Sequence, residues 1–429
     1  MTRILGLMVV FFLTGGFLFS ADWPGWRGPD RTGISKETGL LKTWPAEGPK
    51  LLWKSDRAGM GYAGIAVVDG TAFTMGARGE DEFLLAFDEK GEERWATKIG
   101  PVWDFKSNSW SRGPNSTPLV EGGRIFALSS KGMVLAADQK TGKELWKIDI
   151  AKDLQGEVNP IGGGPEKMGW GYSWSPLVDG DYLVLTPGGP KGLFAAVEKT
   201  TGKIAWRSTQ ITEQATYSSP VAATIHGVRQ YIAATQKAVI GIAAKDGALL
   251  WKHARENDCP DVVCPTPIVH EDQVYMSVGY GVGGEMLKLS LSGEKFEVSS
   301  LWSEKTIGNK QGGVVMIGDY LYGFHENRVW VCQNMKTGKT AWPKSLSVRQ
   351  KLKDGGFLAA DGLLYILDEL GNVGLAEASP KAFQVLSQFK LPEESKTRKS
   401  GGKVWTHPAL SEGRLYLRDQ EWIFCYQIK

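Results

Sequence analysis

Short apolar runs alternate with glycine-containing turns along almost the whole chain. The recurring unit is an apolar run that ends in small residues, an acidic or amide position, a turn of the Thr-Gly-Lys type, and then a tryptophan. Runs of this length between turn residues predict β-strands, and a repeat of about 40 to 60 residues is typical of propeller blades. Five clear copies and one degenerate copy, the one at Trp302, end at Trp95, Trp146, Trp206, Trp251, Trp302 and Trp342.

Each part of the unit has a structural reason. Glycine in the turn supplies the positive φ that a short hairpin connection with a bulge requires. These turn glycines are Gly142, Gly202, Gly247 and Gly338. Small residues before the turn, such as Ala136 and Ala195, leave room for a large ring. We therefore expect alanine and tryptophan positions to interlock between neighbouring blades.

A small hydroxyl residue followed by proline stands upstream of many turns. Proline is tolerated at the first position of a strand, so this motif marks the start of the innermost strand of a blade. The copies are Thr117-Pro118, Ser175-Pro176, Ser219-Pro220 and Thr266-Pro267. Together with the outer strand at the tryptophan, the repeat predicts four strands in each blade.

The two ends of the chain predict how the ring closes. Residues 404–429 contain three candidate strands and no fourth, whereas the run around Trp53 is a tryptophan strand with no blade before it. We expect this N-terminal strand to complete the last blade, because closure removes the open sheet edge. The fold class is therefore all-β, a single eight-bladed β-propeller over residues 50–429. Seven blades is the alternative, because the copy near Phe389 lacks both the Thr-Gly turn and the tryptophan.

The first twenty residues have the layout of a secretory signal peptide. Arg3 precedes an apolar stretch from Ile4 to Phe19, and small residues follow at Ser20 and Ala21. A lone membrane anchor is the alternative for this segment. No other stretch approaches the length of a membrane span, so we expect a mature chain without a transmembrane segment, in the periplasm or secreted. Residues 21–49 then form a capping segment.

Composition limits the functions that need to be considered. The formal net charge is +3 for 429 residues, and the basic residues are spread out, which argues against a nucleic-acid partner. We expect a monomer. Cys259 and Cys264 are close enough in sequence to be a disulfide candidate, whereas Cys332 and Cys425 lie in strand-like runs and are expected to be buried thiols.

The Ala-x-Asp-x-x-Thr-Gly-x-x-x-Trp unit resembles the repeat of the pyrroloquinoline-quinone-like (PQQ-like) propellers. That family includes quinoprotein alcohol dehydrogenases and the propeller lipoprotein of the outer-membrane barrel-assembly machinery, and the resemblance covers roughly residues 50–429. The segment from Trp23 to Gly33 also resembles the N-terminal opening of a group of secreted bacterial propellers. Trp23, Trp26 and Arg27 are expected to pack as a cap on the ring, with a ligand surface as the alternative.

The resemblance leaves enzyme and scaffold to be weighed. It implies that a dehydrogenase would use an aspartate base, a calcium ion, a tryptophan under the quinone and usually two adjacent cysteines. No two cysteines are adjacent here, and no Cys-x-x-Cys-His motif is present. We therefore expect a non-catalytic scaffold that binds an envelope protein or polymer and needs no cofactor. The alternatives are a dehydrogenase with a diverged site that uses PQQ and calcium, of the polyvinyl-alcohol type, and a propeller that binds a sugar-like ligand on aromatic loops.

Long connections into the inner strands carry the candidate site residues, because functional residues concentrate on such loops. No catalytic residue can be assigned. Asp258 and Asp261 are weak candidates for a metal site. The candidate ligand or partner residues are Trp110, Arg112, Asn115, Trp170, Tyr172, Trp174, Tyr217, Glu256, Asp258, Asp261, Trp405 and His407.

Overall fold

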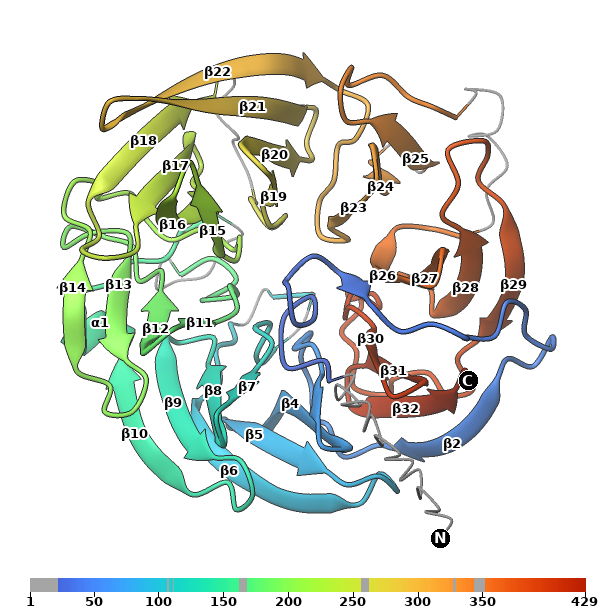
Figure 1. Ribbon diagram of the computed structural model, residues 1–429. Coiled ribbons are helices and arrows are strands. Elements are labelled where there is room, and N and C mark those ends of the chain that lie inside the picture. Colours follow the sequence, from blue (N-terminus) through green and yellow to red (C-terminus); the bar gives the residue numbers. More distant parts are fainter. Residues whose placement is uncertain are drawn as a thin grey trace, which may run out of the picture.

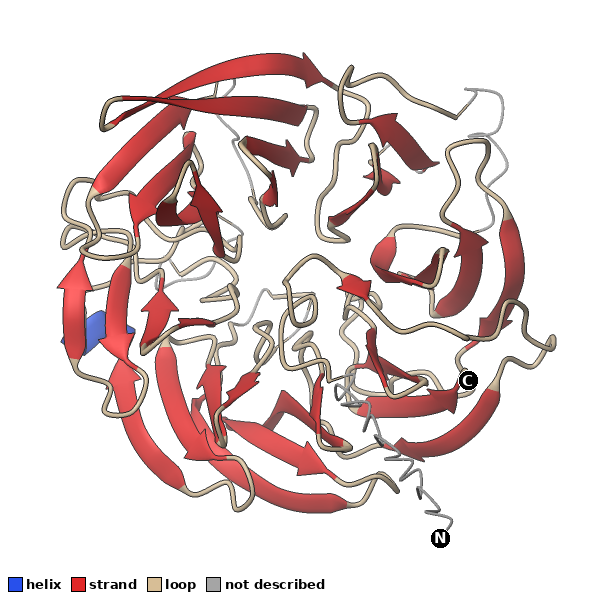
Figure 2. Cartoon of the chain, viewed as in Figure 1, coloured by secondary structure: helices blue, strands red, loops and turns tan. Residues whose placement is uncertain are grey.

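Eight small sheets stand around a central axis in the computed structural model (Figure 1), which describes residues 22–105, 108–110, 112–161, 168–255, 262–326, 329–342 and 352–429. Figure 2 shows that the described chain is strands and loops apart from one short helix, α1 (Ile150–Asp153). The predicted all-β, eight-bladed propeller is therefore confirmed, and the seven-bladed alternative is wrong. The predicted signal peptide lies outside the described residues.

Blades are numbered in chain order, and their strands run antiparallel from the channel outward. Blade 1 consists of β3 (Ala66–Val68), β4 (Thr71–Arg78), β5 (Asp81–Phe87) and β6 (Glu93–Pro101). Blade 2 consists of β7 (Leu119–Glu121), β8 (Arg124–Leu128), β9 (Met133–Asp138) and β10 (Glu144–Asp149). Blade 3 consists of β11 (Leu177–Asp179), β12 (Tyr182–Leu185), β13 (Ala195–Glu198) and β14 (Ile204–Arg207). Blade 4 consists of β15 (Val221–Ile225), β16 (Val228–Ala234), β17 (Ala238–Ala243) and β18 (Leu249–Ala254).

The second half of the ring follows the same order. Blades 5 and 6 consist of β19 (Ile268–His270), β20 (Gln273–Val278), β21 (Gly283–Ser292) and β22 (Lys295–Glu304), and of β23 (Val314–Ile317), β24 (Tyr320–His325) and β25 (Val329–Asn334). Blades 7 and 8 consist of β26 (Gly355–Ala360), β27 (Leu363–Asp368), β28 (Asn372–Glu377) and β29 (Val385–Lys390), and of β30 (Ala409–Ser411), β31 (Arg414–Asp419), β32 (Trp422–Gln427) and the N-terminal β2 (Lys50–Ser55).

Closure of the ring follows the prediction. Strand β2 pairs antiparallel with β32, and Trp53 stands opposite Cys425 in that register. The outermost strand of blade 8 thus comes from the start of the chain, and the three strands inside it come from the end. In Figure 1 the blue β2 lies along the red β32. Strand β29 carries the weak copy at Phe389, so blade 7 is complete without a tryptophan.

The tryptophans contact the neighbouring blades through turn glycines. Ala136 lies opposite Trp146 within one sheet, and Trp146 also packs against the apolar cluster that contains Ala195 of the next blade, so the expected alanine–tryptophan interlock between blades stays a prediction. Gly142 of blade 2 sits on the Trp95 ring of blade 1, where a Cβ would lie 2.5 Å from Cε3. Its φ of 71° also favours glycine. The same contact joins turn glycines to the tryptophan of the preceding blade at Gly91–Trp53, Gly202–Trp146, Gly247–Trp206 and Gly338–Trp302.

Arg418 ties blade 8 to blade 1 beneath the closing strands. Its side chain is fully buried and donates hydrogen bonds across the blade boundary to the Ala63 and Met75 carbonyls, at 2.8 and 2.7 Å. It also donates to Thr74 Oγ1 and to the Gln420 carbonyl. Burial lowers the pKa of Arg418 to about 9. A buried guanidinium is tolerated here because carbonyl and hydroxyl oxygens surround it.

The segment before β2 crosses the ring. The backbone of Trp23 exchanges two hydrogen bonds with Val67 of blade 1, and the Trp26 Nε1 donates to Thr266 Oγ1 beside blade 5. Strand β1 (Ile34–Ser35) then pairs in parallel with the innermost strand of blade 7. The dark blue trace near the centre of Figure 1 is this segment. It therefore reaches opposite sides of the central channel.

We predict that Gly142→Ala destabilises the ring. The new Cβ would meet the Trp95 ring at a positive φ, which costs about 2 to 4 kcal/mol. Gly180→Ala is the matched control, because Gly180 has a φ of 59° but no atom within 4 Å of the place that a Cβ would take; it should cost only about 1 kcal/mol. Denaturant unfolding measures both. Equal losses of unfolding free energy in the two variants would show that contact with the Trp95 ring adds nothing to the cost of the substitution.

Replacement of Arg418 by leucine should cost about 3 to 5 kcal/mol, because several buried carbonyls lose their donor. Arg414→Leu is the control: this neighbour on β31 is partly exposed and lies 3.9 Å from Glu89, so its loss should cost less than about 1 kcal/mol. Thermal unfolding of the two variants gives the comparison. A similar drop in melting temperature for both would contradict the proposed lock between blades.

Candidate functional site

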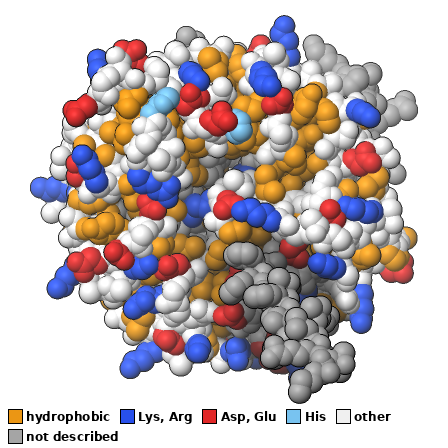
Figure 3. Space-filling model, in the orientation of Figure 1, with side chains coloured by type: hydrophobic (Ala, Val, Ile, Leu, Met, Phe, Trp, Pro, Cys, Tyr) orange, Lys and Arg blue, Asp and Glu red, His pale blue; other side chains and the backbone are white. Residues whose placement is uncertain are grey.

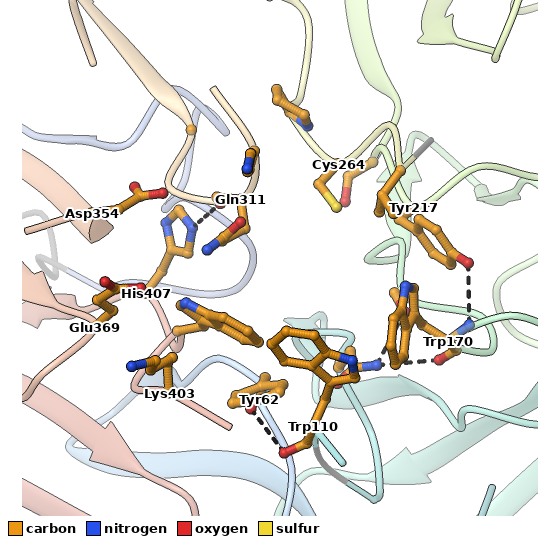
Figure 4. A pocket seen from close by; sticks show the side chains of 18 of the residues that line it. Tyr62, Trp110, Trp170, Tyr217, Cys264, Gln311, Asp354, Glu369, Lys403 and His407 are labelled. Carbon is orange, nitrogen blue, oxygen red and sulfur yellow. Dashed lines mark hydrogen bonds between the residues drawn. The ribbon is translucent and has the colours of Figure 1, made fainter. Parts of the chain in front are cut away.

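A cavity of about 900 Å³ occupies the middle of the ring. Its walls come from the loops that enter the innermost strands, and its residues belong to every blade boundary (Figure 4). In seven blades the fourth residue before the innermost strand lines the cavity. These residues are Tyr62, Asn115, Ser173, Tyr217, Cys264, Lys310 and Trp405. In each of these seven blades the repeat therefore places one side chain at the cavity wall, and the type of side chain differs from blade to blade.

Hydroxyl groups two residues further along fix these loops. Ser175 Oγ accepts a hydrogen bond of 3.0 Å from the Thr117 amide, and Ser219 Oγ accepts one of 2.9 Å from the Ser175 amide. At these two boundaries the hydroxyl of the Ser/Thr-Pro motif thus holds the backbone of the preceding blade. These hydrogen bonds explain why the motif carries a hydroxyl group. They also fix the position along the channel axis at which the cavity residues project.

Four aromatic rings form a continuous wall on one side of the cavity. The ring centroids of Tyr62 and Trp405 are 5.2 Å apart, those of Trp405 and Trp110 are 5.6 Å apart, and those of Trp110 and Trp170 are 6.1 Å apart. Trp110 is 39% exposed, which is unusual for so large a ring. An exposed aromatic wall inside a concave site is typical of ligand-binding surfaces.

Backbone contacts hold this wall in place. The Tyr62 hydroxyl donates to the Trp110 carbonyl at 3.3 Å, and the Gly401 amide donates to the Ser109 carbonyl at 2.8 Å. On the next blade, the Trp170 amide donates to the Tyr217 hydroxyl, which in turn donates to the Ile161 carbonyl at 2.6 Å. The wall is therefore organised before any ligand arrives.

Charged side chains gather on the other side of the cavity, from blades 6 to 8. Figure 4 shows Asp354, Glu369 and His407 together, away from Trp170 and Tyr217. The pKa of Asp354 is raised to about 7, chiefly by burial; the Gly355 amide and Lys310 act to lower it, and the carboxylate of Glu369 acts to raise it. The Gly355 amide donates to Asp354 Oδ1 at 2.8 Å. Among the described residues, no donor reaches its Oδ2.

His407 and Trp26 form the floor. Their ring centroids lie 4.7 Å apart, and His407 Nε2 lies 3.0 Å from the Gln311 carbonyl. Burial lowers the pKa of His407 to about 4, so the ring is neutral near pH 7 and its Nε2 donates to that carbonyl. Trp26 belongs to the segment that crosses the ring. The N-terminal segment therefore contributes directly to the cavity.

The predicted site residues fall into four groups. Six line the cavity: Trp110, Asn115, Trp170, Tyr217, Trp405 and His407. Arg112 instead lies at the rim, 3.3 Å from Glu80 and 3.7 Å from Asp104. Tyr172 and Trp174 are corrections to the expected exposed platform, because both are core residues packed between blades 2 and 3. Glu256, Asp258, Asp261 and the cysteine partner Cys259 lie outside the described residues, so the metal and disulfide hypotheses stay predictions.

Sequence reasoning missed the charged side of the cavity. It followed the tryptophan-rich loops, whereas Lys310 and Glu369 stand in short connections, and Asp354 directly precedes β26 at the end of a longer one. The usable signal was position: counting back from each innermost strand would have found Tyr62 and Lys310.

Within the described ranges, no three His, Cys, Asp or Glu side chains come together in a group that could hold a metal ion. Because Asp258 and Asp261 lie outside the described residues, the calcium and quinone hypotheses stay predictions. Among the helices of the described chain, none has the length and apolar character to cross a bilayer.

Fold and cavity define a β-propeller of PQQ-like repeats with a central cavity that is aromatic on one side. Residues 80–344, more than half of the chain, match the family described as outer membrane protein assembly factor BamB, and the chain belongs to that family. The BamB of Moranella endobia is 24% identical over 65% of this chain and 69% of its own length. That of Yersinia pestis is 23% identical over 58% of this chain and 70% of its own.

Solved structures show the same fold. The BamB of Moraxella catarrhalis superposes with a TM-score of 0.55 at 14% identity, covering 85% of this chain and 96% of that one. A quinohemoprotein alcohol dehydrogenase from Comamonas testosteroni gives a TM-score of 0.61 at 12% identity, covering 95% and 81%. At such identities the likeness concerns the fold alone.

The raised pKa of Asp354 predicts a pH dependence. The folded protein holds this proton up to about pH 7, whereas an unfolded aspartate loses it near its ordinary value of 3.8. The carboxyl therefore costs stability increasingly as the pH rises from about 4 to 7. The melting temperature of Asp354→Asn relative to the wild type should rise over this range and level off above it. Glu82, whose pKa burial also raises to about 7, is present in both proteins and cancels. A difference that shrinks with rising pH would contradict the assignment.

Proposed function

We propose that the chain is a non-catalytic binding propeller of the cell envelope, located in the periplasm or secreted, that holds a partner or envelope polymer at its central cavity. The observation that carries the proposal is the pre-organised aromatic wall around Trp110. A ring of that size remains 39% exposed, although most of the described tryptophans are buried or half-buried. Membership in a family described as an outer-membrane assembly factor supports a binding role in the envelope.

The alternative of a quinone-dependent dehydrogenase is less well supported. Among the described residues, no three His, Cys, Asp or Glu side chains form a group that could hold a metal ion, and the sequence has no pair of adjacent cysteines. Acidic and basic side chains are also mixed over the face seen in Figure 3, so this face carries no single-signed surface that would select a highly charged partner. An uncharged or mixed-charge partner suits such a surface better.

Photocrosslinking in the producing cell tests this function. A benzophenone amino acid in place of Trp110 should give a covalent adduct with an envelope component. The same replacement at Trp422, which lies on β32 beside Lys54 and away from the cavity, is the matched control and should give none. No adduct at position 110, or equal adducts at both positions, would refute a partner at the cavity.

A second arm addresses catalysis. Addition of PQQ and calcium to the purified chain should change neither its absorption spectrum nor its melting temperature. A bound-quinone spectrum, together with reduction of a dye acceptor by an alcohol, would overturn the non-catalytic assignment.

A further inference from the structure

We propose that the ligand of the cavity is a neutral oligosaccharide whose ring faces stack on Trp110 and Trp405 and whose hydroxyl groups hydrogen-bond to Asp354. The inference rests on the proposed function, since it names the ligand class of the same cavity. Four properties of the described residues lead to it: the distribution of aromatic and polar groups, the charge balance, the covered strand edges and the size.

The cavity has two chemically different sides. Sugar rings present apolar C–H faces and a polar rim of hydroxyls, so they need a flat aromatic surface on one side and hydrogen-bonding groups around the edge. The wall from Tyr62 to Trp170 supplies the aromatic surface, and Asp354, Glu369 and Asn115 lie where they can meet hydroxyls. A purely apolar ligand would bury these polar groups without partners, which is unfavourable.

Charges on the cavity wall balance. The acidic side chains that line it are Asp354, Glu369 and Glu326, and the basic ones are Lys310, Lys353 and Lys403. Lys310 Nζ also lies 3.9 Å from Glu326 Oε2 and 4.7 Å from the Tyr280 ring centroid, so its charge is already engaged. Because Asp354 is partly protonated near pH 7, the wall carries only a small net charge and discriminates weakly between acidic and basic ligands. Paired carboxylates and ammonium groups can still exchange hydrogen bonds with hydroxyls.

One recurring mode of peptide recognition adds a strand to an exposed sheet edge. Two of the innermost edges at this channel are already covered by the chain itself. Trp23 occupies the edge of β3 through its hydrogen bonds with Val67, and β1 occupies the edge of β26. The cavity offers side chains from loops instead. A ligand recognised through its own ring faces and hydroxyls fits this arrangement better than an extended peptide.

Size and rigidity agree with a short oligosaccharide. A volume of about 900 Å³ lies within the range of about 300 to 1,000 Å³ found for small-molecule sites. Residue 402 packs directly against the Trp110 backbone, which requires glycine because a Cβ there would lie 2.5 Å from the Trp110 carbonyl oxygen. The rings therefore lose little freedom when a ligand binds, which favours measurable affinity for a weakly interacting neutral molecule.

Titration calorimetry and tryptophan fluorescence with the purified full chain test the proposal. The probes are cellotetraose, xylotetraose, maltotetraose and chitotetraose, with tetragalacturonate as the acidic comparison and hexa-alanine as the peptide comparison. At least one neutral tetrasaccharide should bind and change the fluorescence. It should bind at least tenfold more tightly than either comparison compound.

Variants locate the binding. Trp110→Ala should weaken it at least tenfold, Trp110→Phe should retain part of it, and Trp422→Ala, outside the cavity, should leave it unchanged. Asp354→Ala should weaken binding more than Asp354→Asn, because the amide still exchanges hydrogen bonds with hydroxyls. Trp405→Ala repeats the test on the second ring. Melting temperatures identify any variant that is unfolded, and the conservative Trp110→Phe substitution then decides.

Three results would overturn the oligosaccharide: no binding of any neutral probe, tighter binding of tetragalacturonate or hexa-alanine, or sugar binding that Trp110→Ala leaves intact. These results are separable from failure of the proposed function. A crosslinked partner at position 110 together with no sugar binding would remove the oligosaccharide and keep the binding propeller. Loss of both would remove the cavity as a binding site.

Discussion

In the described chain, five of the eight blade boundaries depend on the contact between a turn glycine and the tryptophan of the preceding blade. A four-stranded sheet cannot bury both of its faces alone, so each blade must be covered by its neighbours. The indole fills the gap at the outer rim, and the glycine lets the next turn lie flat against it, as Gly142 does on Trp95. The apolar core is accordingly divided into clusters that lie between blades, such as the one shared by Phe73 of blade 1 and Ile125 of blade 2.

Packing at the outer rim also fixes the positions of the inner loops around the channel. With blade spacing set by the tryptophans, the inner loops meet at distances where a hydroxyl of one blade reaches the backbone of the preceding one, as Ser175 does with Thr117. The last gap is closed twice, by β2 on the outside and by Arg418 further in. Because β2 comes from the chain's beginning, the segment that precedes it is brought over the channel and supplies Trp26 as the floor of the cavity.

Sequence reasoning reached most of the fold because its signals are local and repeated. Turn glycines, Ser/Thr-Pro motifs and the unpaired strand at Trp53 each predict a feature that a single strand or turn determines. The contact of the turn glycines with the preceding tryptophans was not predicted, because partners across a blade boundary depend on sheet twist and stacking, which no local pattern encodes. Tyr172 and Trp174 show the same limit: exposure of an aromatic residue in a loop depends on what packs over it, and here blades 2 and 3 bury both rings.

The candidate site was predicted unevenly for a related reason. Long, tryptophan-rich loops attract attention, so Trp110 and Trp170 were found, whereas Lys310 and Glu369 stand in short connections that look purely structural. Yet the repeat places Tyr62, Asn115 and Lys310 at equivalent positions, and only their side chains differ. A propeller of this kind separates two tasks: the common geometry of the repeat fixes where a side chain points, and substitution at that one position sets what the cavity binds. The division of the cavity into an aromatic side and a charge-balanced side is thus a product of sequence variation on a uniform frame.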